Sequence, residues 1–174
     1  KGGGPSAFQK RADTNDTRGG RPVTSSKIRY SVVTERVSWV RRMISSIEAL
    51  PLDSYEAFTA DPRNAASAES YLRRGLEALL DLGRHILAKG YAIAVTEYKE
   101  IGVRLSENGV LSQETGQLFR KIEGYRNRMV HLYHEVNQEE LYRISTRNLK
   151  DIERLLEMLV EWLRSNPEKT DRRI

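Results

Sequence analysis

Residues 61–90 read DPRNAASAESYLRRGLEALLDLGRHILAKG and carry a clear helical pattern. The pattern begins at Asp61-Pro62, which suits a helix start with proline in its first turn, and Gly90 is a stop signal. Between them, apolar residues recur every three or four positions, at Ala68, Leu72, Leu76, Leu79, Leu82 and Ile86. This spacing is typical of a helix with one buried face. We therefore predict a long helix over this stretch.

Similar patterns on both sides predict further helices. Upstream, an apolar stripe runs over residues 28–50 and stops at Pro51. Downstream, a shorter helix is expected after Thr96, and it ends at Asn108-Gly109, where glycine suits a left-handed cap.

Two more start signals follow toward the end of the chain. Ser112 can cap a helix that carries apolar residues as far as Tyr133, and Asn137 with Glu140 has the spacing of a capping box. The last helix then extends to Leu163, with a weak region near Ser145-Thr146 where we expect a bend. Four long helices and one short helix with brief connections predict an all-α, antiparallel helical bundle.

Length and composition predict one folded domain with two short ends. A chain of 174 residues usually forms a single domain. Residues 1–26 are rich in Gly, Ser, Thr and charge, and they hold five cations and two acidic residues, or +3 of the net charge of +5. We expect a flexible basic tail or linker over 1–26, the helical domain over 27–166, and a C-terminal tail over 167–174.

Several classes of protein are disfavoured. The absence of cysteine excludes disulfides, thiolate zinc sites and cysteine nucleophiles. Three histidines that do not cluster give no support for a metal site, and we expect no cofactor. No apolar run reaches membrane-spanning length and no secretory signal is visible, so we expect a cytoplasmic protein without a membrane partner.

The segment EGYRNRMVHLY, residues 123–133, concentrates groups that can do chemistry on phosphate. The planar guanidinium of Arg126 matches phosphate oxygens, and His131 can exchange a proton near neutral pH. Together they suffice for metal-free RNA cleavage, in which a base removes the 2′-hydroxyl proton and an arginine stabilises charge on the phosphate.

The helical spacing of these two residues raises a geometric question. Arg126 and His131 are five positions apart, or roughly 140° around a straight helix. Three arrangements would bring the two side chains together. The long arginine could reach round the helix, the helix could bend, or a second protomer related by two-fold symmetry could bring its own copy of the segment across a shared cleft. The last option favours a homodimer.

The stretch YRNRMVHLY resembles the R-x4-H-x-Y signature of the HepT toxins, which are members of the HEPN superfamily. Arg126, His131 and Tyr133 occupy the three fixed positions. The resemblance extends over about residues 27–165 in helix order and spacing, and it includes YLRRGLEALLDLGRHILAKG at 71–90 and LYRISTRNLKDIERLLEMLVEWL at 141–163.

This resemblance implies a dimeric, metal-independent ribonuclease toxin that acts on RNA beside a small nucleotidyltransferase antitoxin of the MNT type. It implies that Arg126 and His131 are catalytic and that Asn127 is a supporting polar group. Tyr133 becomes the candidate site of adenylylation by the partner, while a buried core or interface tyrosine is the competing interpretation.

Three further residues are weaker candidates. Asp81 lies four positions before His85, so the pair either supports the same cleft or forms a simple hydrogen bond on the helix surface. Arg128 and His134 flank the motif and are candidates for RNA binding, and a solvated position is the alternative for both.

Two other functions stay open. The same arginine and histidine would serve a non-catalytic module that binds nucleotide or substrate for a nucleotidyltransferase. A structural dimeric scaffold is the third possibility.

Overall fold

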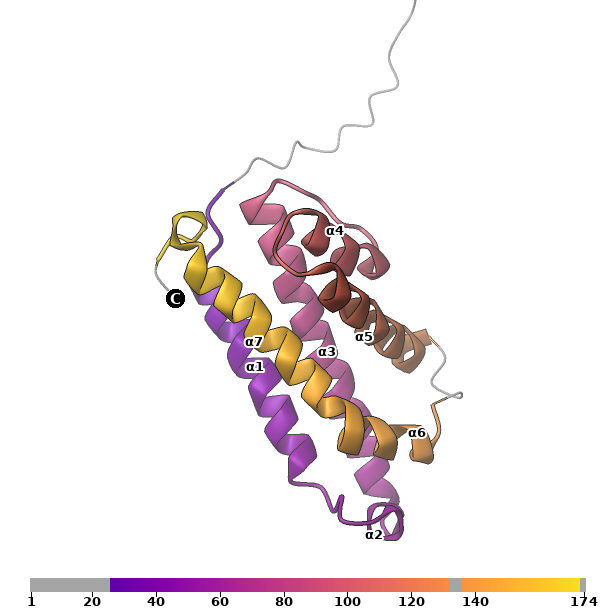
Figure 1. The fold of residues 1–174 in the computed structure, drawn as a ribbon. Helices are drawn as coiled ribbons and strands as arrows, with labels where there is room; N and C mark the ends of the chain where they lie inside the picture. Colours follow the sequence, from indigo (N-terminus) through magenta and orange to yellow (C-terminus); the bar gives the residue numbers. More distant parts are fainter. Residues whose placement is uncertain (1–25, 132–135, 173–174) are drawn as a thin grey trace, which may run out of the picture.

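The computed structural model describes residues 26–131 and 136–172, and helices dominate this part of the chain (Figure 1). Four of the described helices have 17 or more residues, and shorter helices and turns link them. In chain order the elements are α1 (Tyr30–Glu48), α2 (Tyr55–Thr59), α3 (Pro62–Gly90), η1 (Tyr98–Glu100), α4 (Ile101–Glu107), α5 (Gln113–His131), α6 (Gln138–Arg143), η2 (Ile144–Asn148), α7 (Leu149–Ser165) and η3 (Pro167–Lys169).

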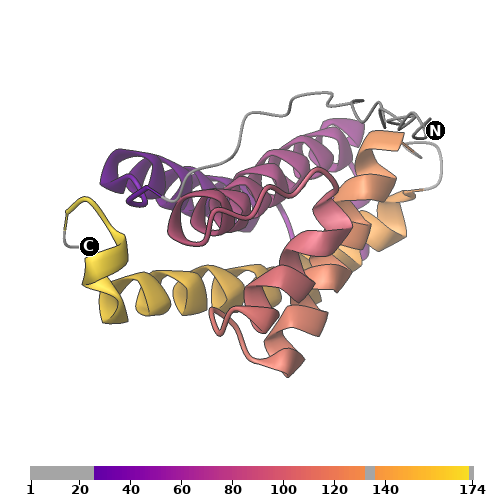
Figure 2. The same cartoon turned by 90° about the horizontal axis from the view of Figure 1, so that it is seen from above.

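The long helix α3 is the centre of the bundle. It packs along α1 on one side and against α4 and α5 on the other, while α7 crosses close to α1 and α5 (Figures 1 and 2). The chain reverses direction between α1 and α3. The predicted all-α bundle is confirmed: α1, α3, α5 and the combined α6–α7 are its long members, and α4 is short.

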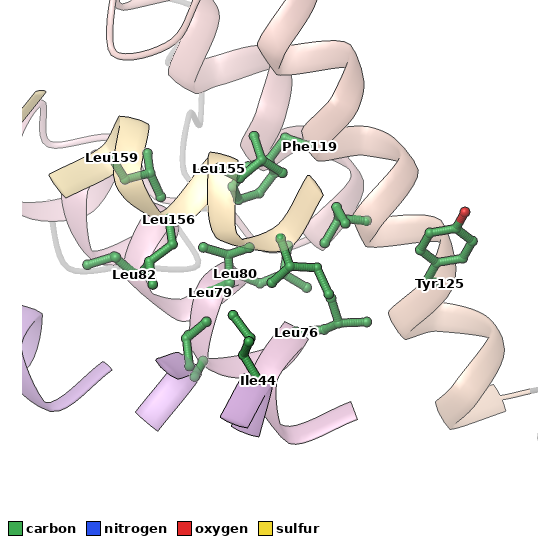
Figure 3. Packing of buried hydrophobic residues seen from close by; sticks show 14 of the residues in the cluster. Ile44, Leu76, Leu79, Leu80, Leu82, Phe119, Tyr125, Leu155, Leu156 and Leu159 are labelled. Carbon is green, nitrogen blue, oxygen red and sulfur yellow. The ribbon is translucent and has the colours of Figure 1, made fainter. Parts of the chain in front are cut away.

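The central position of α3 is reflected in the burial of its side chains. Leu76, Leu79, Leu80 and Leu82 are all fully buried, although a helix with a single buried face would expose some of them. Figure 3 shows leucines of α3 between Ile44 of α1 and the α7 leucines. Each fully buried leucine contributes roughly 2 kcal/mol through removal of apolar surface from water.

The predicted start and stop signals of three helices are confirmed. The Asp61 carboxylate accepts a hydrogen bond from the Arg63 backbone N–H at 2.9 Å. The Ser112 hydroxyl accepts one from the Thr115 N–H at 3.1 Å. Gly109 adopts a φ of 70°, as a left-handed cap requires.

The signals at residues 137–148 are more complex than the sequence indicated. The Asn137 amide oxygen caps α6 by accepting from the Glu140 N–H at 2.8 Å. The Glu140 carboxylate forms ion pairs with Arg128 and Arg143. These pairs take the place of the hydrogen bond from the Asn137 backbone N–H to Glu140 that would complete the expected capping box. The expected bend is the π-helical turn η2, which separates α6 from α7.

Both ends of the described chain meet beside α3. Ile28 was expected inside the first helix, but it precedes α1 and forms a parallel bridge with Thr170. The Ile28 N–H donates to the Lys169 carbonyl at 2.8 Å, and the Asp171 carboxylate accepts from the Tyr30 N–H at 2.8 Å. The segment 167–171 is therefore packed against the start of α1. No helix in residues 26–131 or 136–172 has the length and apolarity needed to cross a membrane.

Candidate active site

Helix α5 presents the candidate catalytic segment to a surface cavity. Its apolar side is buried through Phe119, Ile122, Tyr125 and Met129. The spacing of these four residues turns the polar run 126–128 toward the opposite, partly exposed side. Arg126, Asn127 and Arg128, three of the site residues predicted from the sequence, therefore lie together.

The cavity has a volume of about 530 Å³ and lies between α5 and the segment that leads into α4. Arg126, Asn127 and Arg128 form one wall. The opposite wall consists of Thr96, Glu97, Tyr98 and Lys99. The arrangement offers guanidinium and ammonium groups to an anion, beside an amide and an aromatic ring.

Arg126 is largely enclosed, with 14% of its side chain exposed. Its Nη2 atom lies 3.4 Å from Oε1 of Glu77 on α3, and its Cζ atom lies 4.4 Å from the centre of the Tyr98 ring. The buried Nε atom has no hydrogen-bond partner among the described residues. The described residues therefore do not fill the hydrogen-bonding capacity of Arg126.

A second guanidinium shares the Tyr98 ring. The Cζ atom of Arg84 lies 4.3 Å from the ring centre. Its Nη1 atom is 3.9 Å from the Asp81 carboxylate, which is also 3.9 Å from Nε of Arg36. Asp81 thus lies beside the site and contacts Arg84. Arg84 and Arg126 both contact the ring of Tyr98, which links Asp81 to Arg126 through two intervening residues.

His85 has a different partner from the one expected. Its Nε2 atom accepts a hydrogen bond from the backbone N–H of Arg29 at 3.1 Å, while Asp81 pairs with arginines. Burial, followed by the nearby charges of Lys89 and Arg29, lowers the pKa of His85 below its ordinary value. The predicted pairing of Asp81 with His85 is therefore replaced by a hydrogen bond between His85 and Arg29, the residue that precedes α1.

Arg128 is held at the other edge of the cavity. Its Nη2 atom forms an ion pair with Oε1 of Glu140, and its Cζ atom lies 5.3 Å from the centre of the Tyr125 ring. The same carboxylate oxygen of Glu140 is 3.5 Å from Nη2 of Arg143. Glu140 therefore competes with any anion that approaches Arg128.

The remaining sequence candidates lie at or beyond the end of α5. His131 is the last residue of that helix, but its side chain, like all of Tyr133 and His134, lies outside the described residues. The contacts of these three side chains stay predictions. In the described part of the chain, no group of three or more histidine or acidic side chains is arranged to hold a metal ion.

Two site residues, Glu77 and Tyr98, had no usable sequence signal. Glu77 lies 49 residues before Arg126, and its charge is typical of any solvated helix face. Tyr98 lies in a short segment without helical periodicity. Only the packing of α3 and α5 brings both residues to the guanidinium.

Glu123 adds an unusual electrostatic feature one turn before Arg126. It is 2% exposed, and burial raises its pKa to about 7, although the Gly102 N–H and Arg120 act in the opposite direction. Its Oε1 atom accepts a hydrogen bond from the Gly102 N–H at 3.0 Å. The contact faces α4, so Glu123 joins α5 to the helix that follows the cavity-lining segment 96–99.

Residues 40–159 match the family described as HepT-like ribonucleases, and the candidate pair Arg126 and His131 falls inside this range. The chain belongs to the HepT-like family. It is 23% identical over 128 residues to the mRNA nuclease HepT of Shewanella oneidensis, an alignment that covers 74% of this chain and 96% of the relative.

Solved structures share the HepT-like fold. A tri-AMPylated HEPN toxin of Shewanella oneidensis, solved in complex with an MNT antitoxin, is 23% identical with a TM-score of 0.66, covering 74% of this chain and 96% of that one. A toxin–antitoxin structure with AMP-PNP is 22% identical with the same TM-score, covering 74% and 97%. The cytosolic protein YutE of Bacillus subtilis, whose function is given as unknown, is 15% identical with a TM-score of 0.66, covering 78% and 91%.

Proposed function

We propose that this HepT-like chain is a metal-independent endoribonuclease toxin that cleaves RNA through attack by the 2′-hydroxyl. The observation that carries the proposal is the shared cavity of Arg126, Asn127 and Arg128, where the described residues do not fill the hydrogen-bonding capacity of Arg126. The match to the HepT-like ribonuclease family supports the same activity.

The reaction needs one base and one fork of hydrogen-bond donors. His131 accepts the proton of the 2′-hydroxyl, and the resulting oxygen attacks the adjacent phosphorus. The bond from phosphorus to the 5′-oxygen breaks, and this leaving oxygen takes up a proton. Arg126 donates hydrogen bonds to the phosphate oxygens as charge develops on them. The products are a 2′,3′-cyclic phosphate and a 5′-hydroxyl.

A homodimer supplies the geometry that one straight helix lacks. Because Arg126 and His131 are separated by roughly 140° around α5, we propose that a two-fold mate contributes to each cleft. The supporting residues are Asn127 beside the arginine and Asp81, which pairs with Arg84, the second arginine over the Tyr98 ring. Arg128 and His134 extend the cationic surface toward the RNA.

We further propose that an MNT-type nucleotidyltransferase antitoxin silences the enzyme by adenylylating Tyr133. The phenol oxygen attacks the α-phosphorus of ATP, the new O–P bond forms, pyrophosphate leaves, and the phenol proton passes to solvent. The AMP phosphate competes with RNA for Arg126. A HepT-like relative is tri-AMPylated in its complex with an MNT antitoxin, which supports this regulation.

The deciding experiment is cleavage of defined RNAs by purified protein in excess EDTA. We expect activity in the wild type and none in His131→Ala, with unchanged circular dichroism. Arg147→Ala, which replaces an exposed arginine outside the cavity, is the matched control and should remain active. RNA or nucleotide binding without cleavage would instead support a non-catalytic binding module.

The modification requires its own measurement. After co-expression with a neighbouring nucleotidyltransferase, intact-mass analysis and peptide mapping should find AMP on Tyr133. The Tyr133→Phe variant should escape modification and stay active. AMP found only on other residues, or a Tyr133-modified protein that still cuts RNA, would refute this regulation.

A further inference from the structure

We propose that Tyr98 is a positioning residue that orients the guanidinium of Arg126 for phosphate. The proposal rests on the proposed function of the cavity and extends it to a residue outside the signature motif. Tyr98 comes from η1, between α3 and α4, and it lines the cavity opposite α5.

The ring of Tyr98 is itself held in place. Tyr98 is half-buried and packs against the hydrophobic core at its inner side. Arg84 lies over the ring with a Cζ-to-centre distance of 4.3 Å, and Arg126 lies over it at 4.4 Å. Both distances fall within the range of about 6 Å in which a cation is attracted to an aromatic face.

The other contacts of Arg126 leave its orientation underdetermined. Among the described residues, Arg126 pairs with Glu77 at 3.4 Å, and Glu77 also lies 3.8 Å from Arg73. One shared carboxylate can restrain the position of the guanidinium, but it defines the plane of the group poorly. In our proposal the aromatic ring supplies the missing restraint: its centre lies 4.4 Å from Cζ of Arg126, and stacking of the guanidinium on the ring would fix that plane.

Stacking has a second advantage for catalysis. A hydrogen bond to Arg126 consumes an N–H donor, whereas contact with the ring uses the face of the guanidinium and leaves its edge donors free. The Nε atom of Arg126 has no hydrogen-bond partner among the described residues, and 14% of the side chain, which lines the cavity, is exposed. Tyr98 therefore aligns the arginine without competing with the phosphate.

Arg84 and Asp81 complete the arrangement. Glu77, Asp81 and Arg84 follow one another at spacings of four and three, so they share one face of α3. Asp81 is 3.9 Å from Nη1 of Arg84, which offsets one of the two positive charges over the ring. Asp81 thus acts on the catalytic arginine through Arg84 and Tyr98.

The kinetic test compares Tyr98→Phe with Tyr98→Leu in the full chain. Phenylalanine keeps the aromatic face and should retain wild-type kcat within about twofold, because cation–π attraction resides in the ring. Leucine should lower kcat roughly 3- to 30-fold with a smaller change in KM, since the lost alignment matters most in the transition state. Tyr55→Leu, at an exposed tyrosine away from the cavity, is the control and should match wild type.

A second readout is independent of RNA cleavage. In protein labelled with ¹⁵N-arginine, the Nε–H resonance of Arg126 is assigned by its disappearance in Arg126→Lys. Tyr98→Leu should move and broaden this resonance, because the ring current and the orientation are lost, while Tyr98→Phe should preserve it.

These two readouts separate the two hypotheses. An inactive wild type with the expected resonance changes would refute the ribonuclease function and support the positioning role. An Arg126 resonance that is unchanged in Tyr98→Leu, full activity of that variant, or equal loss of kcat in the phenylalanine and leucine variants would overturn the role of the Tyr98 ring.

Discussion

The carboxylate of Glu123 on α5 accepts a hydrogen bond from the backbone N–H of Gly102 in the first turn of α4, at 3.0 Å. Because the first N–H groups of a helix have no partner within the helix, this side chain caps α4 from a distance. Burial keeps this carboxylate away from water, and it also raises the pKa of Glu123 to about 7.

Glu123→Gln should stabilise the fold at alkaline pH. The raised pKa means that Glu123 favours folding most below its ordinary pKa of 4.5, and that this contribution is lost as pH rises through about 7. Glutamine keeps an acceptor for Gly102 without a charge. We expect the free energy of unfolding of the variant, measured with urea relative to that of wild type, to be about 3 kcal/mol more favourable to the variant at alkaline than at acidic pH. The exposed Glu153→Gln is the control and should show no such trend.

Gly102→Ala should be destabilising because α4 and α5 approach closely at this position. A Cβ atom on Gly102 would lie 2.7 Å from the Gly116 carbonyl oxygen, which is backbone and cannot rotate away. We expect a loss of about 1–3 kcal/mol in the free energy of unfolding. Gly124→Ala is the matched comparison on α5, where a Cβ atom would meet nothing within 4 Å, and it should gain about 0.5–1 kcal/mol through helix propensity.

His85 should make stability sensitive to acid. Its lowered pKa favours the neutral imidazole in the folded state, whose Nε2 accepts from the Arg29 N–H. The stabilisation is present above the ordinary pKa of 6.5 and is lost as pH falls through the lower folded value. His85→Leu should therefore be less stable than wild type at about pH 8, with a difference that shrinks toward about pH 5. A constant difference would mean that the side chain acts only through packing.

Arg126→Lys should abolish most ribonuclease activity. Lysine keeps the positive charge, but it lacks the planar guanidinium, whose Cζ atom lies 4.4 Å from the centre of the Tyr98 ring. We expect a fall of at least about tenfold in kcat/KM, measured with the folded variant. Near-complete activity would show that Arg126 contributes charge alone.

Mixing two inactive variants should restore activity if each cleft takes its arginine and histidine from different protomers. In a mixed dimer of Arg126→Ala and His131→Ala, one cleft then has both residues intact and the other has neither. We expect up to half of the wild-type activity per mixed dimer after unfolding and refolding the two together. Dimers that form by light scattering but stay inactive would place both groups on one protomer.

Local signals predicted much of the fold because they act within a few residues. Asp61 and Ser112 cap the helices that follow them, and Gly109 has the positive φ expected after a helix. The five-residue helix α2 was missed because it is too short to show a period, although Ser54 caps it by accepting from the Ala57 N–H.

The candidate site was harder to predict because its contacts join distant parts of the chain. The motif identified Arg126 through chemistry and resemblance. Nothing near Glu77 or Tyr98 indicates that they meet this arginine, because both contacts depend on how α3 and η1 pack against α5. His85 shows the same effect, since its partner Arg29 is 56 residues away.

The π-helical turn at Ile144–Asn148 joins α6 to α7. A π turn holds one residue more than an α turn, and each residue rotates an α-helix by about 100°. Because the wide turn takes up this extra residue, deleting Thr146 would let α6 run into α7 as an uninterrupted α-helix with the buried leucines of α7, including Leu155 and Leu159, still facing the interior. The π turn thus accommodates one residue like an insertion that leaves both flanking helix faces in place, with Glu140 beside Arg128 and α7 closing the core.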